Sequence, residues 1–252
     1  MKKAIAIILA LVCLSILFSS CGSDSKENAT NTSIVSSTTP TILATTISKP
    51  IATKEPQQNY AIGTIVHFGP YDWQVLAVEN GKLLLITEDA IERRGYHFES
   101  TGVYTAGVTW ETCTLRAYLN GKFLEKFSAQ EQARILEINN TNGDNQWHGT
   151  NGGNDTNDKV FLLSLEEVLK YFGDSGQLKI NNPDSMYFIN DRYNEKRMAK
   201  FNGDWTWWWL RSPGNAKYGA AYVGVDGYIY PNGNGVFDTS SGVRPALWLK
   251  IN

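Results

Sequence analysis

One stretch of this chain holds four of its eight tryptophans: Trp205-Thr206-Trp207-Trp208-Trp209-Leu210-Arg211-Ser212-Pro213-Gly214. Successive side chains of a strand point to opposite faces, so a strand with this sequence places indole rings on both faces. We therefore predict that both faces are covered and that the strand lies centrally in the fold. A second dense run, Gly242 to Leu249, closes the chain and is predicted to be a neighbouring core strand. We expect Trp205 and Trp207 to be the most exposed of the four tryptophans.

Residues 1–20 have the features of a lipoprotein signal peptide. Two lysines precede an apolar run from Ala4 to Phe18, which is shorter than the roughly twenty residues of a membrane-spanning helix. Small residues then lead to Cys21, in a context that resembles the bacterial lipobox, where the cysteine carries lipid. Phe18 departs from that pattern, which usually has an aliphatic residue there. The alternative is an ordinary cleaved signal with an incidental cysteine.

Residues 21–58 follow as a lipidated cysteine and a predicted disordered tether. The segment 22–58 has no aromatic residue and is rich in Ser and Thr, so it cannot bury enough apolar surface to offset the entropy of ordering. Residues 59–252 then have the length of one globular domain. We expect a protein anchored in the cell membrane through lipid on Cys21, on the extracytoplasmic face.

The charged residues give no case for nucleic acid as a partner. The formal net charge is −2, and the basic residues are dispersed among acids and not clustered on one segment. Of three cysteines, Cys13 would leave with the signal and Cys21 would carry lipid, so only Cys113 remains in the domain. An internal disulfide is thereby excluded.

The hydrophobic patterning predicts an α+β domain. Asn80-Gly81 between two apolar runs predicts a two-residue hairpin, and Asp226-Gly227 predicts a second one within 221–230. In that second hairpin Val225 would face Tyr228, and Val223 would face Tyr230. Capping-box patterns begin at Ser128 and Ser164. The predicted strands are 63–68, 72–79 and 82–88, with more after Trp205; the predicted helices are 111–119 (ending at Asn120-Gly121), 129–135, 165–172 and 191–201.

Five ordered motifs carry a resemblance to a known family. They are Phe68 to Leu76; Trp110 with Thr114 to Asn120; Asp158 to Leu165; Trp208 to Gly214; and Gly242 to Leu247. Together they resemble the bacterial family known as domain of unknown function 6273, found in secreted and lipid-anchored proteins. That family in turn resembles the C-type-lectin-like fold of formylglycine-generating enzymes. The resemblance implies a mixed sheet with short flanking helices and long irregular loops, with ligand contacts between the last two motifs.

The same resemblance raises the question of enzyme activity. Formylglycine-generating enzymes use a pair of cysteines, whereas this domain has only Cys113, which we predict to be a half-buried helix residue. Iron enzymes with a similar fold use a histidine triad, and His67, His97 and His148 show no close ligand spacing. We therefore expect a noncatalytic protein without a cofactor.

The segment 139–158 combines seven Asn with three Asp and several Gly. Carboxylate and amide oxygens on a loop suit Ca²⁺, although the spacing departs from the loop pattern of known calcium sites. The prediction is a solvated polar loop, and the alternative is a Ca²⁺ site at Asp144, Asp155, Asn157 and Asp158. Asp158 has a second interpretation, as an anchor before the buried run Val160 to Leu163.

Arg211 and Arg244 lie in apolar motifs, so we expect both to be partly buried and paired with acids or carbonyls. The alternative is that they bind an anionic substrate.

The span 215–241 is the predicted binding surface. Tyrosine gives contact area at low entropic cost and asparagine adapts its hydrogen bonds, and both suit a sugar. The alternative is that the tyrosines pack on the sheet. The candidate ligand-binding residues are Asn215, Lys217, Tyr218, Tyr222, Asp226, Tyr228, Tyr230 and Asn232, and the same span also offers Asn234 and Asp238.

Three functional hypotheses follow from these patterns. The first is a noncatalytic, lipid-anchored module that binds a glycan or protein ligand through its C-terminal loops. The second is a structural or assembly component of the envelope without a small-molecule ligand. The third is an enzyme related to the formylglycine-generating type, which the single cysteine disfavours.

Overall fold

The Asn80-Gly81 turn joins strands β2 (Tyr71–Glu79) and β3 (Lys82–Thr87), which confirms the first predicted hairpin. Asn80 has φ 46° and Gly81 has φ 76°, the left-handed values that a two-residue hairpin of this type requires. The computed structural model describes residues 60–98, 107–180 and 187–251, which all belong to one compact unit, Glu55–Asn252. The signal peptide 1–20, Cys21 and the tether predicted for 21–58 lie outside the described residues.

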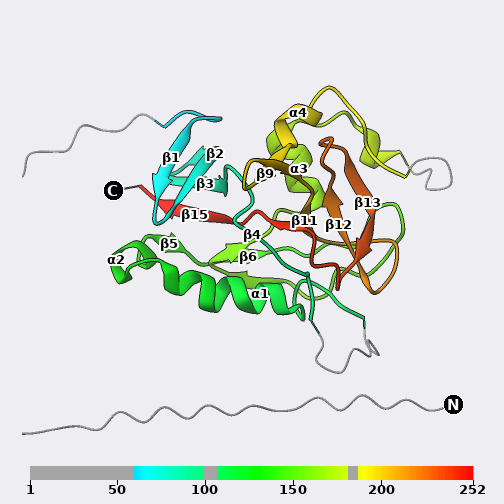
Figure 1. Ribbon diagram of the computed structural model, residues 1–252, viewed down its shortest axis with the longest axis horizontal. Coiled ribbons are helices and arrows are strands. Elements are labelled where there is room, and N and C mark those ends of the chain that lie inside the picture. Colours follow the sequence, from blue (N-terminus) through cyan, green and yellow to red (C-terminus); the bar gives the residue numbers. More distant parts are fainter. Residues whose placement is uncertain (1–59, 99–106, 181–186, 252) are drawn as a thin grey trace, which may run out of the picture. The chain divides into compact units, whose positions relative to one another are not determined.

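Strand β15 (Ala246–Lys250) is the centre of a six-stranded antiparallel sheet (Figure 1). It pairs with β3 on one side, where Leu247 lies opposite Leu85 and Leu249 opposite Leu83. On its other side it pairs with two short strands in succession. The remaining strands of the sheet are β1 (Ile65–Phe68), β2, β5 (Ile135–Leu136) and β8 (Val160–Phe161).

A second sheet contains the tryptophan-rich strand β11 (Trp208–Pro213) at its centre. Strand β14 (Gly242–Val243) runs parallel to β11, with Gly242 opposite Trp208, and the other pairings are antiparallel. Only glycine fits at 242, because a Cβ there would lie 2.8 Å from the Ala90 side chain and 3.0 Å from the Trp207 carbonyl. The other strands are β12 (Gly219–Val223), β13 (Ile229–Gly235) and β4 (Glu92–Arg93).

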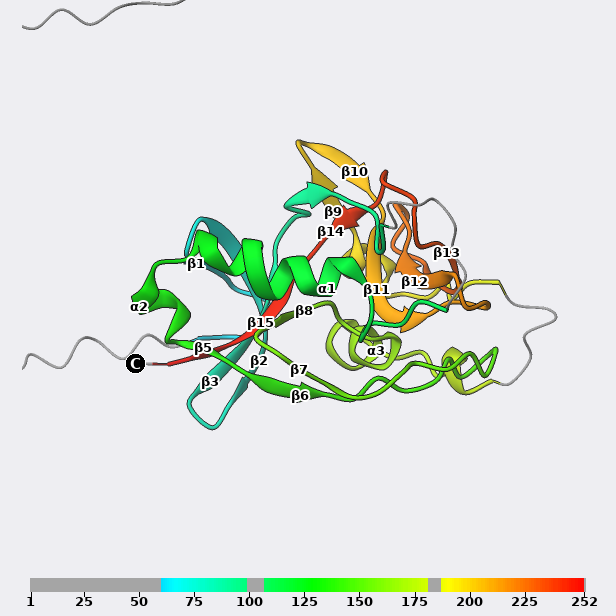
Figure 2. The same ribbon diagram turned by 90° about the horizontal axis from the view of Figure 1, so that it is seen from below.

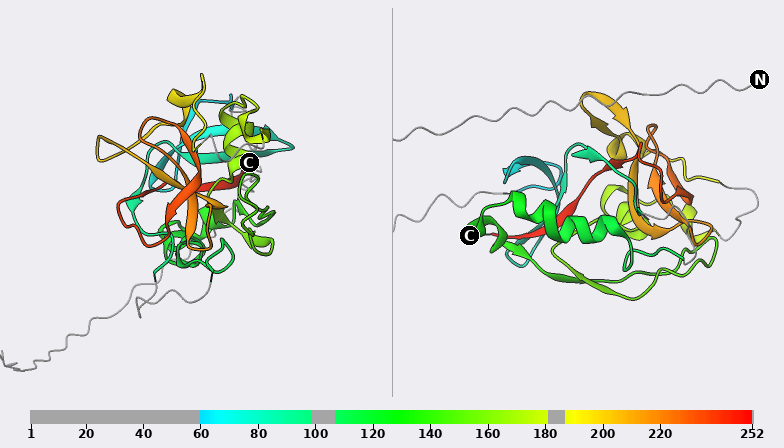
Figure 3. Two further views of the ribbon diagram at one scale, coloured as in Figure 1. Left: turned by 90° about the vertical axis from the view of Figure 1, so that its right-hand side faces the viewer. Right: turned by 60° about the horizontal axis from the view of Figure 1, so that its bottom comes forward.

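The closing run therefore belongs to both sheets. Gly242 pairs with Trp208 of the tryptophan strand, as predicted, and after Pro245 the chain passes into the six-stranded sheet as β15. Figures 2 and 3 show this red segment crossing from one sheet to the other. The two sheets consequently share a continuous core.

The helices confirm the predicted capping boxes at Ser128 and Ser164 and correct other boundaries. The first helix begins at Thr114, and Gly121 does not stop it: the chain continues through a π-helical turn, Leu119–Phe123, and a 3₁₀ turn, Leu124–Lys126. The α-helices are α1 (Thr114–Tyr118), α2 (Ala129–Gln132), α3 (Leu165–Phe172) and α4 (Asn194–Arg197); the remaining elements are η3 (Gln177–Lys179), β6 (Ile138–Asn140), β7 (Thr156–Asp158), β9 (Ala199–Phe201) and β10 (Asp204–Thr206).

Two further predicted helices are shorter than expected. The helix after Ser128 ends at Gln132 and not at Ile135, because Ile135 is buried in β5 against β15. The segment predicted as a helix over 191–201 is helical only in α4, and its end is strand β9. The predicted α+β class is confirmed, with sheets predominating. No helix in the described part of the chain is long and apolar enough to cross a membrane.

Trp208 and Trp209 are both completely buried, so both faces of β11 are covered, as predicted. The indole N–H of Trp208 donates to the carbonyl of Arg197 at 3.0 Å, and that of Trp209 donates to the carbonyl of Arg94 at 3.0 Å. Trp205 is 52% exposed and Trp207 is half-buried. The tryptophans of this stretch thus become more buried along the chain: Trp205 is exposed, Trp207 is half-buried, and Trp208 and Trp209 are in the core.

Replacement of Trp208 by Ala should lower the free energy of unfolding by about 3–5 kcal/mol, because it opens a cavity and leaves the Arg197 carbonyl without its donor. Trp205→Ala, in contrast, should change it by no more than about 0.5 kcal/mol. Urea titrations followed by circular dichroism measure both values. Equal losses in the two variants would contradict the central position of Trp208.

Candidate functional site

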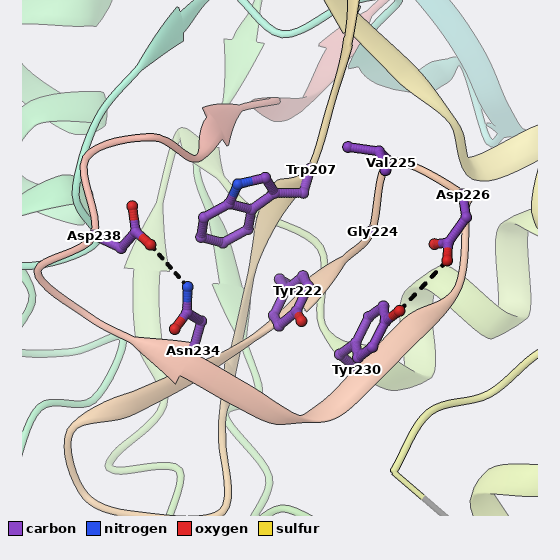
Figure 4. A pocket seen from close by; sticks show the side chains of 8 residues that line it. All are labelled: Trp207, Tyr222, Gly224, Val225, Asp226, Tyr230, Asn234 and Asp238. Carbon is purple, nitrogen blue, oxygen red and sulfur yellow. Dashed lines mark hydrogen bonds between the residues drawn. The ribbon is translucent and has the colours of Figure 1, made fainter.

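Trp207, Tyr222 and Tyr230 form a row of aromatic rings on one face of the five-stranded sheet (Figure 4). The rings of Trp207 and Tyr222 meet edge to face with centroids 5.0 Å apart, and those of Tyr222 and Tyr230 stack at 4.5 Å and 4°. All three side chains are half-buried. At its inner end the row rests on buried Trp209, 4.8 Å from Trp207, so the rings are held by the core.

Strand register creates this row. Tyr222 of β12 lies directly opposite Tyr230 of β13, and Val223 lies opposite Ile229. The predicted register, with Val223 facing Tyr230 and Val225 facing Tyr228, is therefore wrong. The loop between the two strands is wider than the predicted two-residue turn. The Gly224 N–H donates to the Tyr228 carbonyl across the loop, and the Tyr228 N–H donates to the Asp226 carboxylate at 3.0 Å.

Two carboxylates flank the aromatic row. Asp226 accepts a hydrogen bond from the hydroxyl of Tyr230 at 3.4 Å, at one end of the row. Asp238 accepts from the amide of Asn234 at 2.9 Å and from the N–H and hydroxyl of Ser240 at 2.8 and 2.7 Å. Their positions at opposite ends are visible in Figure 4.

These side chains line an open surface pocket of about 290 Å³, named here the Trp207 cavity, at the lower end of the usual size of ligand pockets. Burial and the nearby Asp226 carboxylate raise the pKa of Tyr222, and they raise the pKa of Tyr230 to about 12. Both phenols therefore stay protonated at neutral pH and can donate hydrogen bonds. The cavity is lined by Trp207, Tyr222, Gly224, Val225, Asp226, Tyr230, Asn234 and Asp238.

Three of the eight predicted ligand-binding residues line this cavity: Tyr222, Asp226 and Tyr230. The other five have separate positions. Asn215 and Lys217 are exposed, Lys217 lying over the ring of Tyr218; Tyr228 packs on Phe188; and Asn232 bonds to His148. Trp207, Gly224 and Val225 also line the cavity but are not among the candidate ligand-binding residues. For Trp207, the expectation of a partly exposed indole is the signal that could have identified it.

The four candidate calcium ligands bind separate protein donors. Asp158 is buried and accepts from the Trp110 indole at 2.9 Å and from Arg116 at 2.6 Å, so it anchors the loop, its second interpretation. Asp155 accepts from the Asn142 N–H, Asp144 from the Gly152 N–H, and Asn157 from the Asn139 amide. Within the ranges that the structure describes, no group of three or more His, Cys, Asp or Glu side chains could hold a metal ion. The calcium site stays a prediction.

Arg211 and Arg244 are paired as the sequence predicts, and both are fully rather than partly buried. Arg211 forms an ion pair with Glu167 and donates to the carbonyls of Leu162 and Thr141. Arg244 donates to the carbonyls of Thr87 and Glu88, and burial lowers its pKa to about 10.

A third buried arginine, Arg197, pairs with Asp191, and the sequence analysis did not identify it. All three guanidinium groups have structural contacts outside the Trp207 cavity.

Cys113 caps the N-terminus of α1, where its sulfur accepts from the Arg116 N–H at 3.3 Å. It is buried rather than half-buried, and burial raises its pKa to about 12. The three histidines lie apart: His67 bonds to Asp72, His148 bonds to Asn232, and His97 lines a second cavity.

That second cavity is larger, about 470 Å³, and is lined by Arg93, Arg94 and Phe98 among others. None of the eight predicted ligand-binding residues lines it, whereas three of them line the Trp207 cavity, which is therefore the candidate site.

The thiol of Cys113 should resist alkylation in the folded protein. At pH 8 the unfolded thiol is partly ionised, whereas burial keeps the folded thiol protonated, and only the thiolate reacts. Iodoacetamide labelling, read by mass spectrometry of the peptide that contains Cys113, should therefore be at least about tenfold slower without denaturant than with it. Equal rates would show that the site is open.

Comparison with known proteins identifies the family. The model of the family described as "Domain of unknown function (DUF6273)" matches residues 80–251, well over half of the chain. A search of curated proteins and a search of solved structures each found no match. The matched range contains both closing motifs and every residue of the Trp207 cavity. The chain belongs to the family of domain of unknown function 6273.

Proposed function

We propose that this protein is a noncatalytic binding module that recognises a glycan through the Trp207 cavity. The observation that carries the proposal is the row of half-buried rings with a carboxylate at each end and the Asn234 amide beside one of them. Sugar rings present apolar C–H faces and a rim of hydroxyls, so they need aromatic surface next to hydrogen-bonding groups. The Trp207 cavity supplies both within a space that suits a small group, such as one sugar ring.

The hydrogen bonds to Asp238 favour binding over a role for this carboxylate as the acid of glycoside hydrolysis. Hydrolysis by a carboxylate pair needs one acid with a raised pKa, which donates the proton to the leaving group. Burial tends to raise the pKa of Asp238, but hydrogen bonds from Ser240 and Asn234 outweigh it and lower that pKa. Asp238 is therefore suited to accepting hydrogen bonds from a ligand.

The proposal places the domain, residues 59–252, outside the cell on a tether. Lipid on Cys21 would anchor it to the membrane, and residues 22–58 would carry it away from the surface. The proposal also assigns the domain a C-type-lectin-like fold, in which the irregular strands and loops after Trp208 form the recognition surface. The mixed sheets and short helices are compatible with that assignment.

Removal of the aromatic wall should abolish binding without unfolding the protein. The full chain, purified in mild detergent, is screened on a glycan array, and the retained glycans are then titrated. Trp207→Ala and Tyr222→Ala should each weaken the affinity by about tenfold or more, since hot-spot aromatics contribute 2 kcal/mol or more. Circular dichroism should show no loss of fold.

Trp205→Ala and Tyr187→Ala are matched controls, because both side chains are exposed and neither lines the Trp207 cavity. They should bind as the parent protein does. If all four variants lose affinity equally, or if no glycan is retained, the glycan proposal fails. Retention of a partner protein alone, unaffected by Trp207→Ala, would favour the envelope-assembly hypothesis.

The anchoring proposal has a separate test. Cys21→Ala removes the only acceptor for lipid at the predicted cleavage site, so the protein should move from the membrane fraction to the soluble fraction of lysed cells. Cys13→Ala, within the predicted signal peptide, is the matched control and should leave the protein in the membrane fraction. Immunoblots of the two fractions measure the distribution, and a Cys21→Ala protein that stays with the membrane would contradict lipidation.

A further inference from the structure

The charged residues that line the Trp207 cavity all have the same sign. Its ionisable lining residues are two aspartates and two tyrosines, and none of its lining residues is Lys, Arg or His. At neutral pH the tyrosines are protonated, so the lining carries a formal charge of two negatives from Asp226 and Asp238. A cleft lined by one sign of charge concentrates ligands of the opposite sign.

Neither carboxylate is neutralised by a basic side chain in the described residues. Asp226 accepts from the Tyr228 N–H and the Tyr230 hydroxyl, and Asp238 accepts from Asn234 and Ser240, which are all neutral donors. Hydrogen bonds of this kind hold the carboxylates in place, and those from Ser240 and Asn234 lower the pKa of Asp238. The negative potential therefore remains available to a ligand.

The aromatic rings add to the same preference. Indole and phenol rings carry negative charge on their faces and attract cations, with tryptophan the strongest. The raised pKa of Tyr230, to which Asp226 contributes after burial, has the sign expected for a negative environment. Rings and carboxylates thus favour a cation over a neutral group and disfavour an anion.

We infer that the glycan bound in the Trp207 cavity carries a protonated amine, as a sugar with an unacetylated amino group does. The inference rests on the proposed function and specifies the ligand of the same site. The ammonium group would lie between the aromatic row and one of the carboxylates, where it gains both cation–π and ionic attraction. Glycans that carry carboxylate, phosphate or sulfate groups would be excluded.

The test compares two oligosaccharides that differ only at the amine. The full chain is titrated calorimetrically with an oligomer of glucosamine and with its fully N-acetylated counterpart. The glucosamine oligomer should bind about tenfold tighter or more at about 0.01 M salt. The preference should shrink at about 1 M salt, where the Debye length is only about 3 Å.

The variants separate charge from shape. The double variant Asp226→Asn, Asp238→Asn should lose the preference for the amine, with circular dichroism unchanged. Asp204→Asn, an exposed aspartate on β10 outside the cavity, should retain it.

The inference would be overturned if the N-acetylated oligomer bound as tightly as the amine form, or if an anionic glycan bound and its binding were lost in Trp207→Ala. Both of these results would leave the proposed glycan binding intact. The inference would also be overturned if a lysine-rich peptide bound and the glucosamine oligomer did not. If neither oligomer binds and no array glycan depends on Trp207, the proposed function fails as well.

Discussion

Arg211 is the side chain on which the arrangement of the two sheets and the polar loop depends. From the middle of β11 its guanidinium pairs with Glu167, the residue that closes the capping box of α3, and donates to the carbonyls of Thr141 and Leu162. It thereby joins the tryptophan strand to a helix, to the polar loop and to the end of β8. Because the group is almost completely buried, loss of Glu167 would leave a charge without its partner, which costs about 3–5 kcal/mol.

This buried network explains how a chain with so many Asn and Gly residues presents a defined surface. Asn145 of the polar loop donates to the carbonyls of Pro213 and Pro231, at 2.7 and 2.8 Å, and so fixes the loop to the end of β11 and to β13. The rings of the Trp207 cavity come from the residue before β11, from β12 and from Tyr230 of β13, the neighbour of Pro231, and Trp209 packs behind Trp207. Half-buried rings held in this way lose little conformational entropy when a ligand binds.

Local chemistry made part of this structure predictable from sequence. The Asn80-Gly81 turn and the capping boxes at Ser128 and Ser164 depend on residues a few positions apart, and the structure contains all three. The prediction that the helix ends at Asn120-Gly121 was wrong, because burial of Leu119 and Phe123 keeps the chain helical through the glycine. The predicted strand register around Val223 was also wrong, since the Asp226 carboxylate accepts the Tyr228 N–H within the loop and the loop is wider than a two-residue turn. For the site, the pattern indicated the correct span, but only the fold shows which ring of the tryptophan stretch completes its wall.

Recognition of a glycan at the aromatic row of the five-stranded sheet can be tested with a crystal structure of the protein bound to a retained oligosaccharide. We expect electron density for a sugar ring in contact with Trp207 and Tyr222, with its polar groups within hydrogen-bonding distance of Asp226 or Asp238. Density for the ligand at the cavity beside Arg93, Arg94 and Phe98, with the Trp207 cavity unchanged, would contradict it.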